Sequence, residues 1–148
     1  MKKKILFAMT FIFLFLTVLP VQAQPAQSDE ILFVVGLRLD DVMMRFGIPQ
    51  SVHTARGAEV WQDDVVFVYN EGEFYIFRDR VWQIGVRSVY GLRIGDTRAV
   101  VLLALGERAQ DRGDYILYQI PGSTWPLSLR VNITAGRISG FFVFREDF

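Results

Sequence analysis

The chain has 148 residues, 51% hydrophobic and 14% aromatic, so it is too apolar to be disordered and long enough for one domain or two small ones. Its 16 basic and 16 acidic residues cancel, which gives no support to a nucleic-acid partner. The lack of cysteine excludes a disulfide scaffold, a thiol nucleophile, a zinc–thiolate site and a lipid-anchoring cysteine, and a single histidine, His53, excludes metal sites that need two. We therefore expect no cofactor and no metal.

Residues 1–23 predict a secretory signal peptide. Three lysines at positions 2–4 precede an apolar stretch from Ile5 to Leu19, and Pro20 is followed by small residues that end at Ala23. A membrane-spanning helix needs about 20 apolar residues, so a cleaved signal is favoured over an uncleaved anchor. The interpretation is an exported protein, periplasmic or secreted, with a polar linker over residues 24–30 and membrane contact only through the signal peptide.

Two segments, residues 35–47 and 94–106, align with each other without a gap. Each predicts a short amphipathic helix, because apolar residues recur at helical spacing in both, as Leu39, Val42, Met43 and Phe46 do in the first. Thr97 or Asp96 is expected to cap the second helix. Gly47 and Gly106 fit helix ends of left-handed conformation.

The hydrophobic period changes to two after each helix, which predicts strands. In residues 127–134 apolar and polar side chains alternate, as in an antiparallel strand with one buried face. A short strand over Ile31–Val35 and a turn or bulge at Asp63-Asp64 are further expectations. The expected strands are residues 65–69, 74–77, 81–86, 115–120, 127–134 and 137–144.

From these elements we predict an α+β fold of two tandem helix-plus-β-meander repeats. The repeats cover residues 31–89 and 90–148, and each has one helix and three strands. Such short helices need a surface to pack on. The two repeats are therefore expected to share one antiparallel sheet of about six strands, with the helices on one face.

The repeated segment resembles the SmpA/OmlA (BamE-like) outer-membrane assembly lipoproteins and the tandem-repeat fold of β-lactamase inhibitor protein (BLIP). The chain departs from the lipoproteins in lacking the lipobox cysteine. The resemblance implies a BLIP-like fold and an extracytoplasmic protein partner. The residues that carry it are Gly36, Val42, Gly47 and Pro49 in the first copy and Gly95, Thr97, Val101 and Gly106 in the second.

Aromatic residues point to a binding face. Aligning the two copies places Tyr75, Phe77 and Trp82 outward, on the sheet face away from the helices, where exposed aromatics mark interaction sites. Arg78 and Arg130 could add contacts at the rim. The alternatives are that these aromatics pack on residues 24–30 or the 121–126 loop, or that the register is shifted. Trp125 is a separate candidate, either an anchor or a cap on the core.

No catalytic constellation is visible. His53 is expected to be exposed in a polar loop, and Asp40-Asp41 fits favourable charge in a first helical turn. Asp63 and Asp64 are the candidates for a hydrolase, or for a calcium site together with Glu71. The leading hypothesis is an exported, non-enzymatic protein-binding module of the bacterial cell envelope, whose oligomeric state stays open. The alternative is a binder of small ligands, glycans or envelope polymers.

Overall fold

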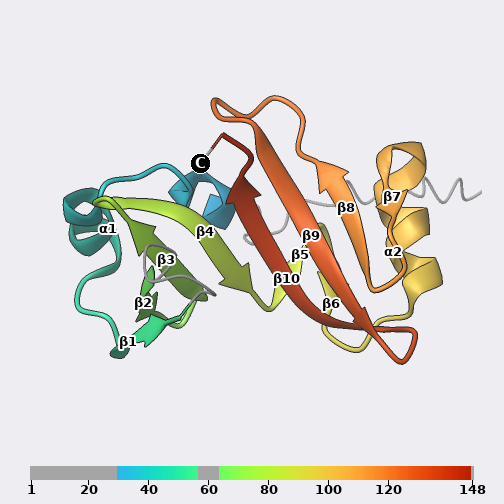
Figure 1. Ribbon diagram of the computed structural model, residues 1–148, viewed down its shortest axis with the longest axis horizontal. Coiled ribbons are helices and arrows are strands. Elements are labelled where there is room, and N and C mark those ends of the chain that lie inside the picture. The colour runs from blue at the N-terminus through green and yellow to red at the C-terminus, as the bar shows by residue number, and fades with distance from the viewer. Residues whose placement is uncertain (1–29, 57–63, 148) are drawn as a thin grey trace, which may run out of the picture.

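The computed structural model describes residues 30–56 and 64–147. Eight strands form one antiparallel sheet in the order β1-β2-β3-β4-β10-β9-β8-β7, and β5 and β6 form a separate two-stranded ribbon (Figure 1). The helices are η1 (Glu30–Val34), α1 (Leu39–Phe46), α2 (Arg98–Leu105) and η3 (Gly106–Arg108). The strands are β1 (Ser51–Ala55), β2 (Asp64–Val68), β3 (Glu73–Phe77), β4 (Arg80–Val86), β5 (Ser88–Val89), β6 (Leu92–Arg93), β7 (Gln110–Asp111), β8 (Tyr115–Gln119), β9 (Leu127–Thr134) and β10 (Arg137–Arg145).

The predicted fold class is wrong. The described residues form mainly one large antiparallel sheet of eight strands with few helical residues, not two helix-plus-meander repeats of three strands each. Two strands that the hydrophobic pattern missed, β1 and β7, extend the sheet at its two edges. Both are largely solvent-exposed, so neither shows the alternation of a half-buried strand.

The centre of the sheet is the pairing of β4 with β10. Val86 lies opposite Phe141, and Ile84 opposite Val143, in an antiparallel register. These four side chains are buried, so the middle of the sheet is also the middle of the core. The strands from the first and second parts of the chain therefore join into a continuous surface.

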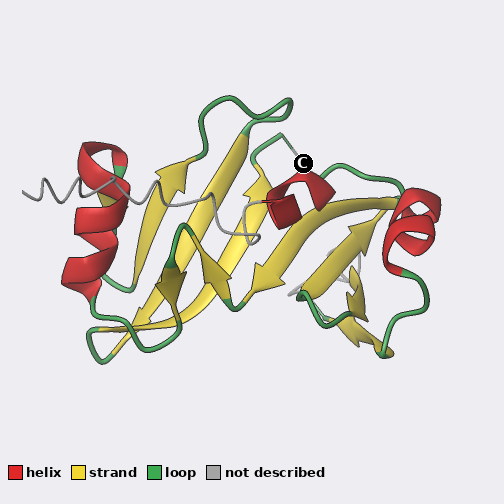
Figure 2. Cartoon of the chain, turned by 180° about the vertical axis from the view of Figure 1, so that it is seen from behind, coloured by secondary structure: helices red, strands yellow, loops and turns green. Residues whose placement is uncertain are grey.

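One face of the sheet carries the core, which the short helices and the ribbon cover (Figure 2). The two α-helices lie near opposite ends of the sheet. The fully buried side chains of Val42 and Val101 anchor α1 and α2, while Val89 and Leu92 anchor the ribbon. Under α1, the ring centroid of Phe46 lies 5.2 Å from that of Phe74. Each helix has only eight residues, so packing rather than intrinsic propensity holds it.

Two glycines tie the turns before the helices to the sheet. The Gly36 N–H donates to the Val81 carbonyl at 2.7 Å, and Arg80 Nη1 donates to the Gly36 carbonyl at 3.0 Å. The same two bonds recur at Gly95, from its N–H to Ile138 and from Arg137 Nη1 to its carbonyl, both at 2.9 Å. The backbone φ angles of Gly36 and Gly95 are +99° and +92°, values that favour glycine.

The helix ends follow the expected positions, but their local conformations need correction. Gly47 and Gly106 end α1 and α2 with φ angles of +75° and +68°, whereas their ψ angles of −149° and −158° lie outside the left-handed helical region. Pro49 follows Gly47. Thr97 is the N-cap of α2 but makes no capping side-chain bond. Asp96 instead accepts a hydrogen bond from the Arg93 N–H at 2.8 Å, which closes the turn before the helix.

Other expectations need correction or fall outside the described part. Ile31–Val35 is not a strand, because residues 30–34 form the 3-10 helix η1. His53 is exposed, but it lies in the edge strand β1 rather than in a loop. The signal peptide, residues 24–29 and Asp63 lie outside the described residues. Within the described ranges, no helix has the length and apolarity needed to cross a bilayer.

Candidate binding face

The sheet face opposite the core, which we name the far face, contains a shallow hollow of about 410 Å³. The hollow lies over strands β4, β9 and β10, in the middle of the sheet. Three aromatic rings, two amides and one guanidinium group surround it. Its lining residues are Trp82, Gln83, Arg130, Asn132, Phe142 and Phe144.

A bulge in β4 places two of these side chains. Tyr75 pairs with Gln83 and Ile76 with Val81, so Trp82 is an extra residue in β4. A bulge leaves one residue unpaired and changes the direction of the side chains that follow it. Val81 therefore points into the core, whereas Trp82 and Gln83 both line the hollow.

A second bulge, in β10, places the two phenylalanines. Ile138 pairs with Ile133 and Gly140 with Asn132, so Ser139 is the extra residue. Beyond the bulge Phe141 and Val143 are buried in the core, and Phe142 and Phe144 line the hollow.

Two glycines lie beside the Phe142 ring. A Cβ built on Gly85 would lie 3.4 Å from Phe142 Cε1, and one on Gly140 would lie 3.5 Å from Phe142 Cε2. These are ordinary van der Waals distances, so the half-buried ring lies against the backbone of its neighbours.

Arg130 supplies the only charged side chain among the residues that line the hollow. Its Nε donates to Asn132 Oδ1 at 2.8 Å, and its Cζ lies 4.3 Å from the centroid of the Tyr115 ring. These two contacts fix the plane of the guanidinium group. Since Arg130 is exposed, its terminal donors can reach a bound molecule.

Tyr75 stands beside the hollow, where its ring makes an edge contact with Phe142 at a centroid distance of 6.3 Å. Its hydroxyl donates to Glu73 Oε2 at 3.1 Å. Burial, together with the carboxylates of Glu73 and Asp64, raises the pKa of Tyr75 to about 12. Trp82 Nε1 donates to Asp64 Oδ1 at 3.0 Å. A carboxylate thus accepts a hydrogen bond from each of these two aromatic side chains.

The structure brings together only some of the six residues selected from the sequence. Trp82 and Arg130 line the hollow and Tyr75 borders it. Phe77 lies at the end of β3, away from the hollow, and the Arg78 guanidinium stacks over its ring at 5.1 Å. The far face is also not bare over its whole area, because Val66, paired with Tyr75, is fully buried.

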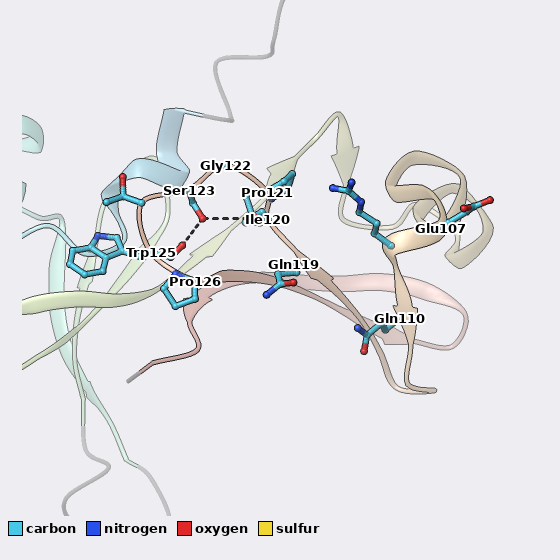
Figure 3. Close-up of a pocket in the computed structure, with 11 residues that line it drawn as sticks. Glu107, Gln110, Gln119, Ile120, Pro121, Gly122, Ser123, Trp125 and Pro126 are labelled. Carbon is cyan, nitrogen blue, oxygen red and sulfur yellow. Dashed lines mark hydrogen bonds between the residues drawn. The ribbon is translucent and has the colours of Figure 1, made fainter.

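Trp125 belongs to another part of the molecule, the loop between β8 and β9. A Cβ on Gly36 would lie 2.3 Å from Trp125 Nε1, so the indole packs directly on that glycine. The Arg145 guanidinium lies 3.8 Å from the Trp125 ring centroid, and Arg145 is held in turn by Asp147 at 2.8 Å. Trp125 also borders a second hollow of about 550 Å³ (Figure 3).

Sequence reasoning missed Gln83, Asn132, Phe142 and Phe144. The signal that could have found Phe142 is the pair of glycines, Gly85 and Gly140, which lie beside its ring on adjacent strands. The two bulges hid this signal, because each reverses the alternation that a regular strand would follow.

His53 and the described carboxylates considered from the sequence lie in different elements. Asp40 and Asp41 lie in the first turn of α1, as expected. Asp64 begins β2 and binds Trp82, and His53 lies exposed in β1. Among residues 30–56 and 64–147, no three His, Asp or Glu side chains are grouped as metal ligands.

Comparisons with known proteins give a likeness in fold and nothing more specific. No protein-family model and no curated protein matches the sequence. A crystal structure of an extracellular protein containing a SCP domain, from Bacillus anthracis str. Ames, is similar with a TM-score of 0.52 and 16% identity. The match covers 85% of this chain and 49% of that one, so this chain spans about half the length of its neighbour. At this identity the likeness concerns the fold alone.

Proposed function

We propose that this chain is an exported, non-enzymatic protein-binding module of the bacterial cell envelope, which holds an extracytoplasmic protein on its far face. The observation that carries the proposal is the hollow lined by Trp82, Phe142 and Phe144 beside Arg130. Aromatic and arginine side chains dominate the energetics of protein interfaces. Their orientation is set by neighbouring groups, so little side-chain entropy is lost on binding.

Export is part of the same proposal. Residues 2–23 have the charge and hydropathy pattern of a secretory signal, and the structural neighbour is described as an extracellular protein. The SmpA/OmlA resemblance, carried by the glycine–valine motif, remains a proposal about ancestry.

The test is capture of partners from the envelope extract of the native organism by the tagged protein. Trp82→Ala and Phe142→Ala are expected to lose the wild-type partner, with affinity at least about tenfold lower for each. Phe33→Ala is the matched control, since it removes the same kind of ring from a side chain that is 68% exposed and does not line the hollow. Partners that bind both hollow variants as well as the wild type would count against this face.

A glycan or other small ligand is the second candidate, because amide and guanidinium groups stand among the rings. Gln83, Arg130 and Asn132 can bond to hydroxyl groups while a sugar ring stacks on an aromatic face. Thermal stabilisation by envelope glycans that disappears in Trp82→Ala, with no captured protein, would favour this function instead.

A further inference from the structure

A separate site lies beside the C-terminal end of β8, which the short edge strand β7 does not reach. The hollow of about 550 Å³ lies between the 120–126 loop and the segment that leads from α2 into β7. Gln119, the last residue of β8, and Gln110, the first of β7, both border it, and Figure 3 shows Gln119 between the loop and Gln110.

The hydrogen-bond pattern shows which way the β8 backbone points. The Ile120 N–H donates to the Leu127 carbonyl at 2.9 Å, and the Ile133 N–H donates to that of Asp114 at 2.8 Å. Even-numbered residues along β8 therefore turn their main-chain groups toward β9. Odd-numbered ones turn toward β7, as the Arg112 N–H bond to the Tyr115 carbonyl at 2.9 Å confirms.

Strand β7 is too short to cover this edge. It pairs only Gln110 with Leu117 and Asp111 with Ile116. The next position in register would face Gln119, but the chain there forms η3, which ends at Arg108. The N–H and carbonyl of Gln119 thus point away from β9 and into the hollow.

We propose that this edge binds an extended peptide segment of a partner protein by strand addition. The segment continues the line of β7, antiparallel to β8, and one of its residues exchanges two main-chain hydrogen bonds with Gln119. The 120–126 loop, held by the Ser123 hydroxyl bonds to the Ile120 and Trp125 carbonyls at 3.3 and 2.5 Å, forms the opposite wall. A whole second sheet would meet β7 and α2, which flank the same edge (Figure 1), so a narrow segment fits better than another copy.

A proline substitution tests the main-chain bonds directly. Gln119→Pro removes the N–H that points into the hollow and leaves the β9 bonds intact, and proline is tolerated at such an edge position. Gln119→Ala is the matched control, since it alters the side chain and keeps the main-chain groups. Peptides selected from a displayed library of random decamers are expected to bind Gln119→Ala within about threefold of wild type, and Gln119→Pro about tenfold more weakly, consistent with the loss of the one hydrogen bond that the N–H donates.

Three results would overturn the proposal, provided that circular dichroism shows both variants folded. One is a selection that yields no binding peptide, and another is binding that Gln119→Pro leaves unchanged. The third is that the wild-type protein self-associates in sedimentation and Gln119→Pro does not. That result would show that the edge binds a second copy of this chain. Peptides lost in Trp82→Ala but not in Gln119→Pro would belong to the far face and would equally contradict this site.

Discussion

Gly36 and Gly95 hold matching places in two turns, yet only one of them is covered. Both have strongly positive φ angles and the same pair of hydrogen bonds to the sheet. The Trp125 indole lies on Gly36, whereas nothing lies within 4 Å of a Cβ built on Gly95. Gly36 is therefore restricted both by its positive φ angle and by the indole packed on it, whereas Gly95 is restricted only by its positive φ angle.

Substituting the two glycines separates these demands. Gly95→Ala is expected to lower the free energy of unfolding by about 1 kcal/mol, the cost of a positive φ in a residue with a Cβ. Gly36→Ala adds the displacement of the indole, a further cost of about 1–3 kcal/mol. Urea unfolding of the two variants checks the difference, and equal losses would show that the indole moves aside freely.

At the scale of elements, β7 is joined to α2 as well as to β8. Arg98, at the start of α2, donates to both Asp111 carboxylate oxygens and, at 2.9 Å, to the Gly113 carbonyl. The Gly113 N–H donates to Asp111 at 3.0 Å. The hydrogen bonds from Arg98 and from the Gly113 N–H keep the pKa of Asp111 below its ordinary value of 3.8.

This arrangement predicts a pH-dependent effect. A carboxyl whose pKa is lowered by folding stabilises the protein above its unfolded pKa, and this contribution is lost as the pH falls through the folded pKa. Asp111→Asn is expected to lower the urea midpoint modestly at pH 7, and the difference from wild type should vanish well below pH 3.8. Glu107→Gln, at an exposed position beside the same helix, serves as the control at pH 7. A difference that persists unchanged in acid would mean that the ion pair is not its cause.

The helices and strands also show where prediction from the sequence succeeded and where it failed. Both α-helices and the six half-buried strands follow from hydrophobic period, because burial on one side leaves a readable pattern. The exposed edges β1 and β7 carry no such pattern. In β10, counting outward from the buried Ile138 assigns Phe142 to the core, but the bulge at Ser139 reverses the assignment. A bulge depends on pairing with a neighbour, which no local pattern contains.

For the whole molecule, the pairing of β4 with β10 joins the first and second parts of the chain into one sheet. The buried contacts of Phe141 and Val143 with Val86 and Ile84 join strands from the two parts of the chain. The buried core likewise forms one cluster, with residues from η1, both α-helices and β10. Neither part of the chain completes a core alone, so we expect the described domain to unfold as one cooperative unit.

Val143→Ala tests this expectation, because Val143 is fully buried at the centre. The loss of two methyl groups there is expected to cost about 1–3 kcal/mol. In calorimetry the variant should show a single transition at a lower temperature, with calorimetric and van't Hoff enthalpies equal. Thr54→Ala, at an exposed position in β1, is the control and should melt close to wild type. A second, separate transition would show that the two parts unfold independently.

The extra residues Trp82 and Ser139 have a consequence for comparing this chain with its relatives. Removing either residue would restore a regular two-residue repeat, and the side chains beyond it would then change faces, Gln83 with Ile84 in β4 and Phe142 with Phe141 in β10. A homologue that lacks one of these insertions must be aligned with a gap at that position. Without the gap, its interior residues would be matched to residues on the far face of this chain.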